Sequence, residues 1–291
     1  RITPRGKRRE TVRRMVFAAV LAAFALVAGC GGDKKKDETS FRIPDTVLSE
    51  IETFHLTTDD YHPVRGGVMA NRDIELHYPA EDYMRGVAIK SFGLLMKAYE
   101  TVSKEIGRPA AGTLVVIGAS DLDEYLLMTR KEWWHYGVVN GDTIIFEPLD
   151  IMFKRSIVQP SMMNRVGQAA INRRSGGRSP LWLKEAVATR LAGEGDILKT
   201  QIPEFEAEGR DMNPSPERIE QAIAEGTDRG ESRIAYYAAY RMLENLLASH
   251  SMDNVMSFFD RLREGMTLDE ASVESFGISY AALIDRVRVD R

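Results

Sequence analysis

The apolar residues of this chain are spaced in two different ways along its length, and this change constrains the fold more than any other feature. Up to about residue 146 they form short runs that are typical of strands, separated by stretches with helical spacing. Beyond Pro160 the spacing is helical throughout. Strands first and helices afterwards indicate an α+β fold. We therefore expect a small mixed β-sheet lobe followed by a helical lobe, over residues 70–160 and 161–291.

Local patterns set the limits of the expected elements. The expected strands are residues 73–78, 113–117 and 143–146. An apolar stripe predicts a helix between Met84 and Ile106, and Ser120-Asp121 is typical of the cap of a short helix. The later helices are expected at 161–174, at 180–192 with Ser179-Pro180 as its cap, at 234–249, and after Ser251, Thr267 and Ser279. Residues 41–70 indicate an irregular arm, and residues 194–215 indicate a loop.

The N-terminal residues have the pattern of an export signal. Residues 7–14 are strongly basic, and the apolar run from Met15 to Ala28 has 14 residues. A bilayer-spanning helix takes roughly 20 apolar residues, so this run matches a signal-peptide core better. The run leads to Leu-Val-Ala-Gly-Cys at residues 26–30, which resembles the lipobox of bacterial lipoproteins. Residues 1–29 are thus expected to be a lipoprotein signal peptide.

The lipobox resemblance implies that Cys30 becomes the lipidated N-terminus of the mature protein. It also implies a membrane partner through the lipid and a place in the cell envelope, on the periplasmic or extracellular face. Residues 31–40 are polar and charged, so we expect residues 30–69 to form a flexible tether and an arm. The alternative is an N-terminal anchor helix in which Cys30 is incidental.

Charge and cysteine content exclude two classes of protein. The net charge is −4, and it becomes −10 without residues 1–29, which hold seven basic residues and one acidic residue. A chain this acidic is a poor candidate for nucleic acid, because affinity for phosphates comes from cationic side chains. Cys30 is the only cysteine, so an internal disulfide framework is excluded.

The segment at residues 180–188 reads P-L-W-L-K-E-A-V-A and carries a family resemblance. It resembles the P-x-W-L-x-E-G-x-A segment of the peptidase MA-like, gluzincin-type zinc metallopeptidases. Further segments match in the same order: the strand at 113–117, W-W-H-Y-G at 133–137, the strand at 143–146, A-Y-Y-A-A at 235–239, and G-M-T-L with F-G between 265 and 277. The resemblance implies a zincin-like fold and one peptidase MA-like domain over residues 70–291.

The residues that would hold zinc in that family are replaced here. Members carry H-E-x-x-H on the helix before this segment, with both histidines on zinc and the glutamate as general base. The matching pentapeptide reads N-R-V-G-Q, so Asn164 and Gln168 stand for the histidines and Arg165 for the base. Only Glu185, at the position of the third ligand, is retained. We expect no metal, no cofactor and no catalytic residue at these vestigial positions.

These replacements favour a non-catalytic function. The expected protein is a membrane-anchored, degenerate peptidase-like lipoprotein that binds or scaffolds a protein or peptide of the cell envelope. Trp133, Trp134 and Tyr236 are candidates to line its cleft, although such aromatic residues also serve as core packing. The first alternative is an active peptidase or other hydrolase with a non-standard or misaligned site. The second is a purely structural envelope lipoprotein.

The vacated zinc position leads to an expectation about Arg165. Glu185 would be a partly buried carboxylate without a metal partner, and an unpaired buried charge is costly. Arg165 lies on the neighbouring helix, and its guanidinium can pair with a carboxylate through two nitrogens. We expect Arg165 to bridge to Glu185, with Asn164 and Gln168 donating hydrogen bonds around the pair. The alternative is that Arg165 turns outward to solvent.

The leader generates a prediction about membrane attachment. Cys30→Ser removes the only thiol that could carry a lipid, so most of the protein should move from the membrane fraction to the soluble fraction. Immunoblotting of fractionated cells measures this, with wild type as the reference. A variant that remains in the membrane fraction as wild type does would contradict lipid anchoring.

Overall fold

The computed structural model describes residues 66–288. The expected signal peptide, Cys30 and the tether lie outside these residues. Within residues 66–288, no helix combines the length and the apolar character needed to cross a bilayer. The fold is α+β, as expected: a mixed β-sheet is followed by helices.

The sheet has five strands in the order β1-β2-β3-β5-β4. The three central strands β2, β3 and β5 run parallel to one another, and each edge strand is antiparallel to its neighbour. Alternate side chains of the central strands are buried, which fixes their register on the core. The strands are β1 Gly67–Ala70, β2 Ile74–Tyr78, β3 Leu114–Gly118, β4 Gly137–Asn140 and β5 Thr143–Phe146.

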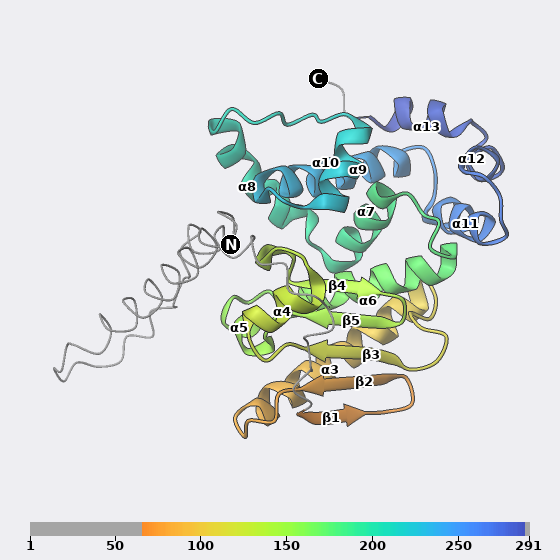
Figure 1. Ribbon diagram of the computed structural model, residues 1–291. Helices are drawn as coiled ribbons and strands as arrows, with labels where there is room; N and C mark the ends of the chain where they lie inside the picture. Colours follow the sequence, from red (N-terminus) through yellow and green to blue (C-terminus); the bar gives the residue numbers. More distant parts are fainter. Residues whose placement is uncertain (1–65, 289–291) are drawn as a thin grey trace, which may run out of the picture. The chain divides into compact units, whose positions relative to one another are not determined.

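The helices cover the sheet and then build the second half of the fold. Figure 1 shows α3 behind the sheet and α7 to α13 gathered beyond the β4 side of it. The helices of the first half are α3 Met84–Glu105, α4 Leu122–Thr129, the 3₁₀ turn η2 Trp133–His135 and α5 Leu149–Lys154. Those of the second half are α6 Val158–Ser175, α7 Leu181–Ala192, α8 Gly195–Ala207, α9 Pro216–Glu225, α10 Arg229–Leu247, α11 Met252–Arg263, α12 Leu268–Phe276 and α13 Tyr280–Val287.

Several expected boundaries were wrong. Residues 67–70 form strand β1 instead of an irregular arm, because four residues are too few to show a strand period. Helix α6 starts at Val158 and not after Pro160, since proline is tolerated in a first helical turn. Helix α10 starts at residue 229 and not at 234, with Asp228 accepting a hydrogen bond from the Glu231 amide.

The largest error is the expected loop at 194–215, where helix α8 runs from Gly195 to Ala207. Pro203 and the flanking glycines gave the segment the composition of a loop. Only Gly195 and Leu198 of this helix are buried. The helix therefore lacks the regularly spaced buried apolar residues by which a helix is predicted from sequence. Packing against α10 and not intrinsic pattern stabilises it.

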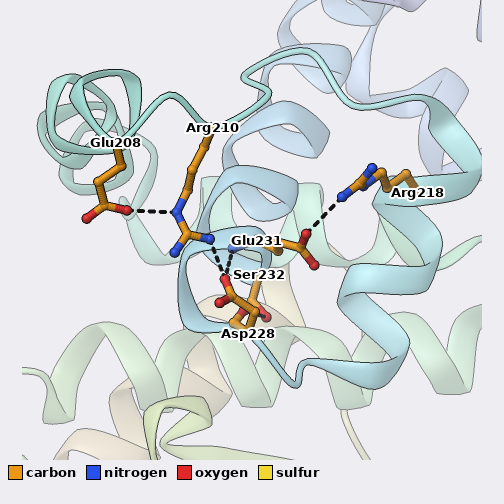
Figure 2. Close-up of polar contacts among 6 residues, drawn as sticks. All are labelled: Glu208, Arg210, Arg218, Asp228, Glu231 and Ser232. Carbon is orange, nitrogen blue, oxygen red and sulfur yellow. Dashed lines mark hydrogen bonds and ion pairs between the residues drawn. The ribbon is translucent and has the colours of Figure 1, made fainter. Parts of the chain in front are cut away.

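Ion pairs connect the chain after α8 to the start of α10. Figure 2 shows Arg210 between two carboxylates, with 2.8 Å from Nε to Glu208 and 2.6 Å from Nη1 to Asp228. On the other side, Arg218 of α9 donates to Glu231 of α10 at 2.9 Å. Asp228 therefore serves both as the cap of α10 and as the anchor of the preceding loop.

Helices α6 and α7 pack side by side, as expected. A Cβ added at Gly167 of α6 would lie 3.7 Å from the Ala188 Cα and 3.2 Å from the Leu191 Cδ1. Gly167 therefore lies in the contact between the two helices, where an added methyl group would require the Leu191 side chain to shift slightly. Because the helices approach so closely, polar side chains on their facing surfaces can reach one another.

The cap of α7 differs from the expectation. Ser179 makes no capping hydrogen bond, and its buried hydroxyl has no partner within residues 66–288. Glu220 of α9 accepts instead, from the Leu181 amide at 3.1 Å and from the Trp182 amide at 3.0 Å. A carboxylate at this position also interacts favourably with the helix dipole. A helix that the sequence did not reveal thus holds the start of α7.

Glu220 generates a prediction about stability. Glu220→Ala leaves two first-turn amides of α7 without their acceptor, and we expect a loss of roughly 1–2 kcal/mol in the free energy of unfolding. Urea unfolding followed by circular dichroism measures it. Gln221→Ala is the matched control, because Gln221 is exposed on the same helix and should change the stability little. Equal effects of the two variants would contradict the capping role.

Candidate functional site

The structure brings together the four positions that the resemblance singled out. Asn164, Arg165 and Gln168 lie on α6 and Glu185 lies on α7. Gln168 Nε2 donates to Glu185 Oε2 at 2.7 Å and to Asn164 Oδ1 at 2.9 Å, and Asn164 Nδ2 lies 3.5 Å from Glu185 Oε1. Asn164, Gln168 and Glu185 are only 3%, 6% and 5% exposed. The carboxylate of Glu185 is therefore buried and satisfied by amides, as expected.

Arg165 points inward and contacts Glu185, but with one nitrogen instead of two. Its Nη1 lies 3.8 Å from Glu185 Oε2, while its Nη2 donates to the His135 carbonyl at 2.9 Å. The expected bridge is present and the expected two-nitrogen pairing is wrong, because the carbonyl draws away the second nitrogen. Burial disfavours the charged guanidinium, but Glu185 and Glu194 outweigh it and raise the pKa of Arg165.

Glu194 is a site residue that sequence reasoning missed. It directly follows Gly193, the left-handed residue that ends α7, and it lay in the segment interpreted as a loop. Its Oε2 accepts from Asn164 Nδ2 at 2.7 Å. Burial raises the pKa of Glu194, although Arg165 and Asn164 act in the opposite direction. The one available signal was the C-terminal glycine of α7, which places the next residue at that helix end.

His135 connects the sheet half of the fold to α10. Its Nε2 lies 3.1 Å from the Gly226 carbonyl and its Nδ1 lies 3.1 Å from the Tyr236 hydroxyl. A carbonyl can only accept, so Nε2 carries the proton and Nδ1 accepts from Tyr236. Burial lowers the pKa of His135 to about 4, and the positive charge of Arg165 adds to this effect. The ring is therefore neutral near pH 7.

A small, partly open cavity lies beside these residues. Its volume is about 20 Å³, above the roughly 10–15 Å³ that one water molecule requires. Trp134 and Tyr236 line it, as expected for the cleft. Trp133 does not line it, because its ring packs against the guanidinium groups of Arg155 at 5.1 Å and Arg229 at 5.8 Å. The other lining residues are Tyr136, Ser161, Asn164, Arg165, Glu185, Thr189, Glu194, Leu198 and Arg233.

The side chains at this position do not fit the zinc ion that the resemblance would imply. Amide nitrogens of Asn164 and Gln168 point at carboxylate oxygens and donate to them, so they offer no lone pair to a metal. The guanidinium of Arg165 adds a fixed positive charge next to Glu185. Within residues 66–288, no group of three or more histidine, cysteine, aspartate or glutamate side chains is placed to hold a metal ion.

Comparison with known proteins adds no family to this picture. No protein-family model matches the chain, and neither does any curated protein sequence. The function therefore has to be inferred from the residues of the site and their chemistry.

His135 generates a prediction about acid sensitivity. The pKa of His135 is about 4 in the folded protein and 6.5 in the unfolded chain, so the unfolded chain takes up the proton first as the pH falls. The contribution of the neutral ring to the free energy of unfolding is therefore fully present above pH 6.5 and is lost as the pH falls toward 4. At about 1.4 kcal/mol per pKa unit, this group should cost about 3 kcal/mol between pH 7 and pH 4.

The measurement is urea unfolding of wild type and His135→Gln across that pH range. The variant should be less stable at pH 7, and its disadvantage should shrink as the pH falls. A difference between the two proteins that stays constant with pH would show that His135 is not the titrating group.

Proposed function

We propose that this protein is a lipid-anchored component of the bacterial cell envelope whose folded domain is a zincin-like, catalytically degenerate relative of the peptidase MA-like enzymes. Its role is to bind or scaffold an envelope protein or peptide. The observation that carries the proposal is the arginine at the position of the family's general base. The Nη1 atom of this residue, Arg165, lies 3.8 Å from Glu185 Oε2. The lipobox at Cys30 supports the anchor, and the segment at 180–188 supports the family relation.

The chemistry of the site argues against peptide hydrolysis by the route of that family. The route needs a metal-bound water and a carboxylate that takes its proton. Arginine cannot accept a proton at accessible pH. Glu185, although it lines the cavity, is paired with Gln168 and Arg165. The side chains thus stabilise the contact between α6 and α7, and none of them stands in for the glutamate base of that route.

Two other functions remain as alternatives to the proposed binding role. A hydrolase with a different site would need a base with a free lone pair, and both ring nitrogens of His135 are engaged by Gly226 and Tyr236. A purely structural lipoprotein would use the polar cluster only for stability. The cavity of about 20 Å³ favours binding of a small group over the insertion of a peptide side chain, so a larger partner would contact the surface around it.

The proposed relation to the zinc enzymes is tested by restoring the family residues. The triple variant Asn164→His, Arg165→Glu, Gln168→His recreates two imidazoles and a carboxylate beside Glu185. If the alignment with the family is right, the variant should bind about one zinc per chain, while wild type should bind none tightly. Metal analysis after dialysis against a weak chelator measures both.

Two further variants control for the role of each residue. The double variant Asn164→His, Gln168→His keeps Arg165, whose charge should weaken zinc binding by at least tenfold relative to the triple variant. Adding Glu185→Gln to the triple variant should also weaken binding. Thermal unfolding confirms that each protein is folded. A folded triple variant that takes up no zinc, or a wild type that holds stoichiometric zinc, would overturn the proposal.

A further inference from the structure

Three buried nitrogen donors around the cavity lack an acceptor. They are Trp134 Nε1, Arg165 Nε and Arg233 Nε, and none has a hydrogen-bond partner within residues 66–288. All three side chains line the same cavity. Buried N–H groups are nearly always paired in folded proteins, so three unpaired donors around one space indicate that an acceptor ligand belongs there.

Both guanidinium groups are held in place by their other nitrogens. Arg165 Nη2 donates to the His135 carbonyl at 2.9 Å. Arg233 Nη2 donates to the Tyr136 hydroxyl at 2.8 Å, and its guanidinium carbon lies 5.3 Å from the centre of the Tyr136 ring. Because these contacts fix the planes of the two groups, their Nε–H donors are already oriented before a ligand arrives.

The two carboxylates of the cavity already have partners of their own. Glu185 is paired with Gln168 and Arg165, and Glu194 accepts a hydrogen bond from Asn164 at 2.7 Å. The Nε–H groups of Arg165 and Arg233 are therefore the charged donors that remain for the oxygens of an anion.

The surroundings of Trp134 add further positive charge. The centre of the Trp133 ring lies 5.9 Å from that of the Trp134 ring. The guanidiniums of Arg155 and Arg229 pack on the Trp133 ring. Arg229 is exposed and stands one helical turn before Arg233 on α10. Because Arg155 is paired with the buried Glu147 at 3.1 Å, the added charge comes from Arg229.

We propose that this cavity binds a small carboxylate group, whose oxygens accept hydrogen bonds from Trp134, Arg165 and Arg233. The inference rests on the proposed non-catalytic binding role and names its ligand class. A guanidinium recognises the planar, two-oxygen geometry of a carboxylate better than it recognises a spherical anion. The volume of about 20 Å³ limits the buried part of the ligand to the carboxylate itself.

The test follows the indole N–H signals of the protein by ¹H–¹⁵N NMR during titration with sodium formate at constant ionic strength. The chain has three tryptophans. The Trp134 signal, assigned with Trp134→Phe, should shift and saturate. The Trp182 signal is an internal reference, because its indole already donates to Tyr280 at 2.9 Å and should not move.

Variants on α10 locate the binding. Arg233→Lys keeps the charge but removes the Nε donor, and formate affinity should fall by at least tenfold. Arg241→Lys is the matched control, since Arg241 is exposed on the same helix and also packs on a tyrosine ring, that of Tyr237. Its affinity for formate should equal that of wild type.

Two further titrations identify the source of the carboxylate. A peptide with a free C-terminus that shifts the Trp134 signal, where its amidated form does not, assigns a chain terminus as ligand, and a response to formate alone assigns a small free acid. The proposal is overturned if formate causes no saturable shift, or if chloride shifts the signal as well as formate does. Zinc uptake by the triple variant reports only on the relation to the peptidases, so failure there and failure here are separate results.

Discussion

The buried carboxylate of Glu185 is the constraint on which the centre of this protein depends. A carboxylate that is 5% exposed costs several kcal/mol unless its charge is compensated. The compensation comes from α6, through the Gln168 amide at 2.7 Å and the Arg165 guanidinium at 3.8 Å. Between them in the sequence, Gly167 faces Ala188 and Leu191 of α7. The residues that pair with Glu185 and a residue that packs on α7 therefore lie in the same turn of α6.

The same arginine extends the network to the sheet half of the fold. Its second nitrogen bonds the His135 carbonyl, and the ring of His135 bonds both the Gly226 carbonyl and the Tyr236 hydroxyl. The 3₁₀ turn η2 is in this way joined to α6, α10 and the turn before α10. Such a network is stabilising only while its members are satisfied. The unpaired donors around the cavity are thus the part of the site that points to a ligand, and the proposed binding role agrees with a site that is polar and preorganised.

Sequence patterns predicted much of this arrangement. The period change near Pro160 gave the α+β class, and the apolar runs gave the three central strands. The resemblance of the P-L-W-L-K-E segment to a peptidase family singled out Glu185 and, with it, Asn164, Arg165 and Gln168. The need to neutralise a buried carboxylate then predicted that Arg165 turns inward. The fold class and the strands follow from local periodicity and the inward turn of Arg165 from side-chain chemistry, whereas the choice of the four positions came from the resemblance.

The sequence by itself determined the fold class, the central strands and most helices, and a family resemblance singled out four residues of the polar cluster on α6 and α7. Only the tertiary structure decided that Glu194 joins the cluster, that Glu220 caps α7 in place of Ser179, and that Trp133 stays out of the cavity that Trp134 lines. It also decided that Arg165 offers Glu185 one nitrogen and not two, because the second meets the His135 carbonyl. Each of these outcomes depends on contacts between segments far apart in the chain or on competition between acceptors, and neither leaves a periodic signal in the sequence.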